Sequence, residues 1–370
     1  MSAQDPFPWH LPICDAHCHP TDTMSSLSDI PAMRASSLTI MATRAQDQKL
    51  VADAAAGSSS SSTTPGKAVV PAFGWHPWFS HLLYDDAGNS TPGSGPDKEV
   101  HYAAVLQPEP DTAFIASLPD PTPVSSFIKS TRTLLDSHPK ALVGEIGLDK
   151  AFRLPQPWNP SDQASRDESL TPGGREGRLL SPHRVRMEHQ RAILAAQLRL
   201  AAETRRAVSV HGVQAHGVLH ETLAATWKGH EREVITRRKR RLVAQGAEDF
   251  SSDDDEDEDK PYPPRICLHS FSGSVEVLKQ YLHPAIPARI FVSLSSAVNL
   301  STEATSTRTD EVLRALPDES VLVESDLHVA GEDMDAALEE MYRHVCKVKG
   351  WELEEGVRRI AKNYEAFIHG

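Results

Sequence analysis

The sequence predicts an α/β protein with a TIM-type (β/α)8 barrel. Eight short β-branched or apolar runs recur along the chain, turn residues bound them, and helix-length stretches separate most of them. A strand–helix unit repeated in this way is typical of a parallel barrel. Because barrels exceed the usual domain size, the 370 residues suit a single barrel domain spanning 1–370.

The eight predicted strands share short length and an excess of β-forming residues. They are Leu11–Ala16, Leu38–Thr43, Ala68–Phe73, Ala141–Ile146, Ala207–Val210, Arg265–Leu268, Arg289–Ser293 and Val321–Glu324. Between the fifth strand and the one before it, His183–Thr204 keeps apolar residues at a spacing of about 3.6, which places them on one helical face. This alternation indicates helices that cover the outside of the barrel.

Four stretches rich in Ser, Pro, Gly or charge interrupt the pattern, and we expect them to be irregular or disordered surface insertions. They cover residues 54–66, 85–97, 153–174 and 229–264. The last contains the basic cluster Arg237–Arg241 and the acidic run Asp253–Asp259. A nuclear-import signal, a solvated loop and a contact for a protein partner are open readings of this charged insertion.

Charge and cysteine content exclude several classes of protein. The formal net charge is −13, of which the acidic run supplies −7, so the rest of the chain is mildly acidic. Any nucleic-acid chemistry must therefore rely on a local site with cations. No signal peptide, C-x-x-C pair or apolar run of about 20 residues is present. We expect free thiols, no membrane association and a cytoplasmic location, with the nucleus as an alternative.

Histidines and carboxylates stand where predicted strands end. His17 and His19 follow the first strand, and in an extended chain residues two apart point to the same face. The other strand ends that carry such residues are those at His76, Glu145, His211, His269 and Asp326. A lone histidine is more often a hydrogen-bonded core residue than a ligand, but the strand ends of a barrel converge on one mouth.

Imidazoles with carboxylates, and no convergent thiolates, suit divalent metal ions such as Zn²⁺, Mn²⁺ or Mg²⁺. We expect two ions, one held by His17, His19, Glu145 and Asp326 and the other by Glu145, His211 and His269. Glu145 would bridge the ions. Asp326 would orient the attacking water or accept its proton, so Glu145 and Asp326 are the candidate catalytic residues.

Candidate substrate contacts lie beside these ligands. His76 is expected to contact a substrate oxygen or to support a ligand. Ser270 and Ser272 follow His269 and could hold a phosphate at the start of a helix, although ordinary helix capping explains them equally well. The chain has no G-x-S-x-G motif, Walker loop or dinucleotide fingerprint, which disfavours serine hydrolases and nucleotide-binding folds.

With these residues in place, the sequence resembles the TatD family of metal-dependent deoxyribonucleases, within the amidohydrolase-like barrels. The resemblance covers nearly the whole chain outside the insertions. It is carried by D-A-H-C-H at Asp15–His19, G-W-H-P at Gly74–Pro77, G-E-I-G-L-D at Gly144–Asp149, V-H at Val210–His211, H-S-F-S-G-S at His269–Ser274, E-S-D at Glu324–Asp326 and Asn363 before Phe367.

The resemblance implies a divalent-metal-dependent phosphodiesterase that acts on DNA ends, often as a 3′ exonuclease, with the ligand roles given above. It extends to a fungal TatD-like branch, some of whose members are described as interactors of a cell-cycle ubiquitin-ligase subunit. Val213 and Gln214 stand where the family usually has an arginine and an acidic residue, so a phosphate clamp is missing. Lys150 could restore positive charge near the substrate as a point charge.

Three functions therefore remain open on the sequence: hydrolysis of DNA ends, metal-dependent hydrolysis of another substrate such as a different phosphoester or a cyclic amide, and a scaffold that binds protein partners. The first follows from the ligand set and the family resemblance. The second follows from Val213 and Gln214, and the third from the charged insertion and the fungal branch.

Overall fold

Eight parallel strands, arranged in the order of the sequence, form the centre of the computed structural model, which describes residues 5–59, 67–86, 95–159, 166–234 and 260–370. One sheet has the order β1-β2-β3 and the other β12-β11-β10-β9-β7. The strands are β1 (Cys14–Cys18), β2 (Ser37–Met41), β3 (Ala68–Ala72), β7 (Val143–Asp149), β9 (Val208–Val213), β10 (Arg265–Leu268), β11 (Arg289–Leu294) and β12 (Val321–Val323).

Backbone hydrogen bonds join the two sheets at both seams. The Phe73 N–H donates to the carbonyl of Leu142, and the Leu142 N–H donates to that of Pro71, both at 3.0 Å. At the other seam, the Asp326 N–H donates to the His17 carbonyl at 3.0 Å and the His19 N–H to the Leu327 carbonyl at 2.8 Å. The predicted TIM-type barrel is confirmed.

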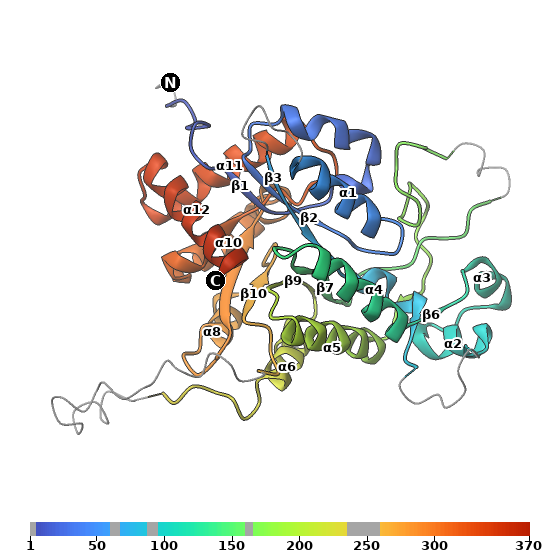
Figure 1. Cartoon of the computed structure of the whole chain (residues 1–370). Helices are drawn as coiled ribbons and strands as arrows, with labels where there is room; N and C mark the ends of the chain where they lie inside the picture. The colour runs from blue at the N-terminus through green and yellow to red at the C-terminus, as the bar shows by residue number, and fades with distance from the viewer. Residues whose placement is uncertain (1–4, 60–66, 87–94, 160–165, 235–259) are drawn as a thin grey trace.

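Helices cover the strands from outside (Figure 1). They are α1 (Gln48–Ser59), α2 (Lys98–Val105), α3 (Thr112–Ser117), α4 (Val124–Ser137), α5 (Met187–Glu203), α6 (His216–Thr226), α8 (Val275–Tyr281), α9 (Ser296–Asn299), α10 (Glu303–Ala315), α11 (Glu332–Lys349) and α12 (Leu353–His369). In α5, Ile193, Leu194, Leu198 and Ala201 are buried, as the helical spacing of its apolar residues predicts.

The C-terminal helices α11 and α12 (red) pack next to the N-terminal strand β1 (blue) in Figure 1. The Tyr342 hydroxyl of α11 donates to the Cys14 carbonyl and accepts from the Cys14 N–H, each at 3.0 Å. The helix α11 ends at Gly350, whose left-handed φ of 68° suits a residue without a Cβ. This packing holds β1, and with it the seam between β1 and the segment after β12, in place.

Three expectations about boundaries need correction. The first, fourth and fifth predicted strands begin and end later than predicted, at Cys14–Cys18, Val143–Asp149 and Val208–Val213, so His17 and His211 lie inside β1 and β9 rather than after a strand. The stretch expected to be irregular from residue 54 is helical as far as Ser59, because α1 continues through the alanines. In the range 153–174, Leu154 is buried in an apolar cluster with Tyr102 and Leu106, and the buried Thr171 donates its N–H to the Asp22 carbonyl, so its described parts pack on the rest of the protein.

Short additional elements interrupt the strand–helix alternation, and most of them lie between β3 and α5. They are the two-residue strands β4 (Leu83–Tyr84), β5 (Leu106–Gln107), β6 (Thr122–Pro123) and β8 (Arg184–Val185), the 3₁₀ helices Pro20–Asp22 and Met24–Ala32 after β1, Pro77–Leu82 after β3 and Asp318–Ser320 before β12. Among the described helices, none combines the length and apolarity required to cross a membrane. The four cysteines are buried free thiols, as expected.

Candidate metal centre

Side chains from six barrel strands converge around the carboxylate of Glu145 at the carboxyl ends of those strands. His17 and Glu145 lie within β1 and β7, His211 lies in β9, and the others directly follow a strand: His19, His76, His269 and Asp326. Parallel strands place their carboxyl ends at one mouth of the barrel. The fold therefore brings together, at this mouth, the residues that the sequence predicted to lie close to one another.

We call the first group of atoms the Oε2 cluster: His17 Nε2, His19 Nε2, Glu145 Oε2 and Asp326 Oδ1. The two nitrogens are 2.9 Å apart, and Glu145 Oε2 lies 3.5 and 3.2 Å from them. Asp326 Oδ1 lies 3.9 and 3.7 Å from the same nitrogens. Ligands about 2.0–2.2 Å from one cation stand roughly 3–3.5 Å from each other, so this donor set fits a divalent ion.

The second group is the Oε1 cluster: Glu145 Oε1, His211 Nδ1 and His269 Nε2. Glu145 Oε1 is 2.9 Å from the His211 nitrogen and 2.8 Å from the His269 nitrogen. The two nitrogens are 3.1 Å apart. Each oxygen of one carboxylate thus faces its own set of nitrogen donors, which is the arrangement of a bridging ligand.

His76 contacts Glu145 but differs from the other histidines. Its Nδ1 accepts the Trp78 N–H at 3.2 Å, so the neutral ring carries its proton on Nε2, which lies 3.1 Å from Glu145 Oε1. Burial lowers the pKa of His76 to about 4, which keeps the ring neutral. Of the two roles expected for His76, its geometry favours support of Glu145 over contact with substrate.

Hydrogen-bond partners orient the rings of the two clusters, and the sequence did not single these partners out. Ser209 Oγ lies 2.8 Å from His17 Nδ1, which turns Nε2 toward the Oε2 cluster. Asp149 Oδ2 lies 3.1 Å from His211 Nε2, which turns Nδ1 toward Glu145. Such partners fix the tautomer and direction of metal-binding histidines. Asp149 ends the G-L-D motif at a strand end, which is the only sequence signal that pointed to it.

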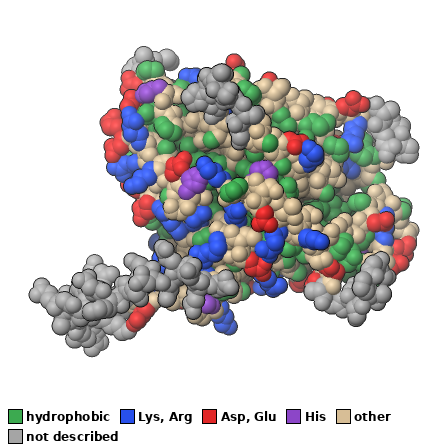
Figure 2. Space-filling model, in the orientation of Figure 1, with side chains coloured by type: hydrophobic (Ala, Val, Ile, Leu, Met, Phe, Trp, Pro, Cys, Tyr) green, Lys and Arg blue, Asp and Glu red, His purple; other side chains and the backbone are tan. Residues whose placement is uncertain are grey.

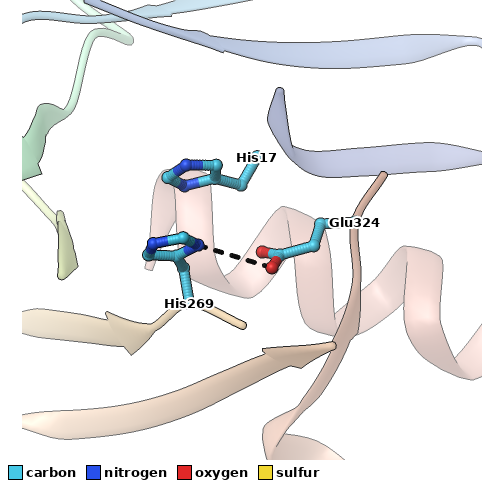
Figure 3. A group of neighbouring side chains, drawn as sticks. All are labelled: His17, His269 and Glu324. Carbon is cyan, nitrogen blue, oxygen red and sulfur yellow. Dashed lines mark ion pairs between the residues drawn. The ribbon is translucent and has the colours of Figure 1, made fainter. Parts of the chain in front are cut away.

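Glu324 supports His269 from the other side (Figure 3). Its Oε1 lies 3.5 Å from His269 Nδ1 and accepts the Ser270 N–H at 2.8 Å and the Ser270 hydroxyl at 2.7 Å. The Ser293 hydroxyl donates to its other oxygen. His17, His269 and Glu324 are also close enough to hold a cation. However, the two rings stack in parallel at 3.8 Å, and Glu324 already accepts three hydrogen bonds.

Asp15 ties the two seam strands together beneath the Oε2 cluster. Its carboxylate accepts the His17 N–H at 3.1 Å, the Ser325 N–H at 3.0 Å and the Ser325 hydroxyl. Burial raises the pKa of Asp15 to about 7 in spite of these hydrogen bonds. Asp15 therefore fixes the distance between the chain segments that carry His17 and Asp326.

Electrostatics at Glu145 favour the charged carboxylate. Burial opposes its ionisation, yet the imidazoles of His76, His269 and His17 hold its pKa well below the usual range. Burial likewise acts to lower the pKa of His269, but Glu145 and Glu324 raise it well above the ordinary value. A raised pKa means that His269 keeps its proton, and with it a positive charge, beside Glu145. A divalent cation can supply that positive charge instead, so metal binding at such a site releases protons.

The three other residues expected to contact substrate, Ser270, Ser272 and Lys150, differ in burial and in hydrogen bonding. The Ser270 hydroxyl donates to Glu324, lies 3.1 Å from Asp326 Oδ2 and is thus committed to carboxylates. Ser272 is half-buried, and Ser274, not Ser272, caps α8. Lys150 is exposed, and its backbone N–H donates to the Val213 carbonyl at 3.0 Å, which places it beside the end of β9.

A parallel barrel with histidines and carboxylates gathered at the carboxyl ends of its strands defines a metal-dependent hydrolase class. The family model described as TatD related DNase matches residues 14–369. The chain belongs to this family of metal-dependent hydrolases. The resemblance to the TatD family that the sequence motifs indicated is therefore confirmed.

Two curated relatives cover nearly the whole chain. The Cut9-interacting protein scn1 of Schizosaccharomyces pombe is 40% identical over 356 residues, which are 96% of this chain and 98% of that protein. A Saccharomyces cerevisiae protein described as an uncharacterized deoxyribonuclease is 27% identical over 373 residues, with 96% of this chain and 99% of that protein covered.

Solved structures share the fold at low identity. YJJV, a TatD homologue from Escherichia coli K12, superposes with a TM-score of 0.54 at 16% identity, over 97% of this chain and 98% of that chain. A TatD family hydrolase from Entamoeba histolytica gives a TM-score of 0.54 at 11% identity, with the same coverage. At such identities the likeness concerns the fold alone.

Proposed function

We propose that the chain is a divalent-metal-dependent phosphodiesterase that releases nucleotides from the 3′ ends of DNA with two cations. One observation carries the proposal: the two oxygens of Glu145 face separate clusters of donors whose spacings suit one cation each. Membership of the TatD related DNase family supports the substrate.

Each cluster residue has a role in this proposal. The Oε2 cluster would hold one cation, the Oε1 cluster the other, and Glu145 would bridge them. Divalent cations bound there would acidify a water molecule and neutralise charge on phosphate oxygens. Asp326, whose side chain is 16% exposed, faces the mouth more than buried Glu145, so its carboxylate can orient the attacking water and accept its proton. Lys150 and Ser272 would contact the phosphate chain.

The test is an Asp326→Asn variant assayed with Mg²⁺ or Mn²⁺ on single-stranded DNA with free 3′ ends. Since Asp326 is both a proposed ligand and the proposed proton acceptor, we expect nucleotide release to fall by at least about 100-fold. The matched control is Asp53→Asn, because Asp53 is exposed on α1 and pairs with Lys49. Equal nucleotide release by the wild type and Asp326→Asn would discard the site.

A second candidate is hydrolysis of another phosphoester or a cyclic amide by the same residues. It is favoured by Val213 and Gln214, which provide no arginine where the family usually clamps a phosphate; Gln214 is exposed at the end of β9. Protein that contains stoichiometric metal but leaves DNA intact would support this candidate. Rapid turnover of single-stranded DNA would count against it.

We also propose that the chain binds a protein partner, a role compatible with catalysis. The support is the 40% identity to a protein named for its interaction with Cut9. The charged segment Arg237–Asp259, which we expected to contact a partner, lies outside the described residues. Binding of purified Cut9 to the full chain and to a chain that lacks residues 237–259 tests both statements, and unchanged binding would exclude the segment.

A further inference from the structure

Two aromatic side chains form a stacked pair at the rim of the metal centre. The rings of Trp78 and Phe152 are 4.4 Å apart between centroids and only 11° from parallel. Trp78 follows β3, in the 3₁₀ helix Pro77–Leu82, and Phe152 follows β7. Trp78 is nevertheless 37% exposed, and Phe152 is half-buried. A stacked aromatic pair that is partly open to water beside a cluster of candidate ligands is a candidate contact for a substrate.

Hydrogen bonds hold this pair rigidly against the proposed ligands. Trp78 Nε1 donates to Asp149 Oδ2 at 2.6 Å, and the same oxygen lies 3.1 Å from His211 Nε2. The Phe152 N–H donates to the other oxygen of Asp149 at 2.9 Å. The edge-on ring of His76 lies 4.6 Å from Trp78. One carboxylate thus positions the pair and a candidate ligand together.

Positively charged residues lie near Phe152 in the sequence. Lys150 is two residues before it and Arg153 is the residue after it, and both are exposed. On the face of the molecule drawn in Figure 2, Lys and Arg are interspersed with Asp and Glu rather than gathered in one basic area. Binding of DNA by a broad basic surface is therefore disfavoured, and a local binding site is required.

We propose that Trp78 and Phe152 form a stacking platform for an unpaired nucleobase of single-stranded DNA, beside the phosphodiester that is cleaved. This inference rests on the proposed function and specifies its substrate. Every base has an aromatic face, but inside a duplex neighbouring bases cover both faces, so an unpaired base reaches the platform while a base within a duplex does not. Stacking would supply the binding energy that the missing phosphate clamp does not, with Lys150 beside the phosphate.

The experiment measures binding rather than turnover. Fluorescence anisotropy gives the Kd of the full chain for a labelled single-stranded oligonucleotide whose terminal 3′ linkage is a phosphorothioate, and for the same strand with an abasic 3′ nucleotide. Stacking is worth about 1–3 kcal/mol per base. We therefore expect the abasic end to bind at least about fivefold more weakly to the wild type.

Three variants separate stacking from support of Asp149. Trp78→Ala and Phe152→Ala should each weaken binding of the normal strand while leaving the abasic strand unchanged, because both remove the platform. Trp78→Phe keeps an aromatic ring but loses the hydrogen bond to Asp149, and it should bind the normal strand nearly as tightly as the wild type. Melting curves confirm that each variant is folded.

Two results would overturn the platform. One is equal affinity of the wild type for the normal and abasic strands, a comparison that needs no variant. The other is a loss in Trp78→Phe as large as in Trp78→Ala, with Phe152→Ala unaffected, which would assign Trp78 to positioning Asp149. Wild-type protein that cleaves neither DNA nor bis(p-nitrophenyl) phosphate would instead overturn the proposed function itself.

Discussion

At the scale of single residues, the central feature of this molecule is the buried carboxylate of Glu145. Its side chain is only 3% exposed, and an unpaired carboxylate at such a position costs several kcal/mol. Imidazoles on both of its oxygens offset that cost. The same neighbours give Glu145 two sets of donors, so the arrangement that makes its burial possible also makes it a candidate bridge between cations.

His81 leads to a prediction about pH and stability that is independent of the proposed ligands. It is buried, and burial together with His189 and His101 lowers its pKa to about 3. In the unfolded chain its pKa is about 6.5, so below that pH the unfolded state binds a proton that the folded state does not. The stability of the fold should therefore fall as the pH decreases from 6.5 toward 3.

Between pH 7 and pH 5 this single histidine accounts for about 2 kcal/mol of lost unfolding free energy. Urea denaturation of the wild type and of His81→Gln at both pH values measures it, with EDTA present in all samples. The variant should lose about 2 kcal/mol less than the wild type over this interval. Equal losses would show that His81 is not responsible.

At the scale of residues, the sequence predicted which side chains meet but not what orients them. His17, Glu145, His269 and Asp326 were predictable because each lies at or near the end of a predicted strand, and a barrel brings strand ends together. Asp149 and Glu324 stand in the same motifs, yet their roles depend on contacts with other strands. Periodicity along one strand carries no information about such contacts.

At the scale of elements, close packing of strands constrains Gly147. It lies in β7 opposite His211 of β9, with a φ of 149°, and a Cβ there would overlap the carbonyl oxygen of His211. We expect Gly147→Ala to lower the unfolding free energy by at least about 2 kcal/mol. The change would also displace a proposed ligand.

Chemical denaturation of Gly147→Ala checks this, with Gly217→Ala as the matched control. Gly217 lies in α6 and has open space where a Cβ would be, so its substitution should change the unfolding free energy by no more than about 1 kcal/mol. A Gly147→Ala protein as stable as the control would contradict the close packing of β7 on β9.

All eight barrel strands were predictable because each is a buried run of β-forming residues between turns. The pairs β4 with β6 and β5 with β8 were not, since two residues give no periodicity. The shift of the first strand toward Cys18 also escaped prediction. It arises because Cys18 pairs with Ile40 of β2, a contact visible only in three dimensions.

At the scale of the whole molecule, closure of the barrel is what turns scattered residues into a site. β1 and β12 stand near opposite ends of the chain, and their seam places His17 beside Asp326. The acidic net charge, and the mixed charges on the face drawn in Figure 2, favour nucleic-acid recognition at a local site such as this mouth. Catalysis and substrate choice should therefore both respond to changes there and to few elsewhere.

The most direct test is anomalous diffraction from crystals grown with Mn²⁺ or Zn²⁺. We predict two peaks, one surrounded by His17, His19, Glu145 and Asp326, and one by Glu145, His211 and His269. Two peaks bridged by Glu145 would bear out the central claim. A single peak among His17, His269 and Glu324, or no peak beside Glu145, would contradict it.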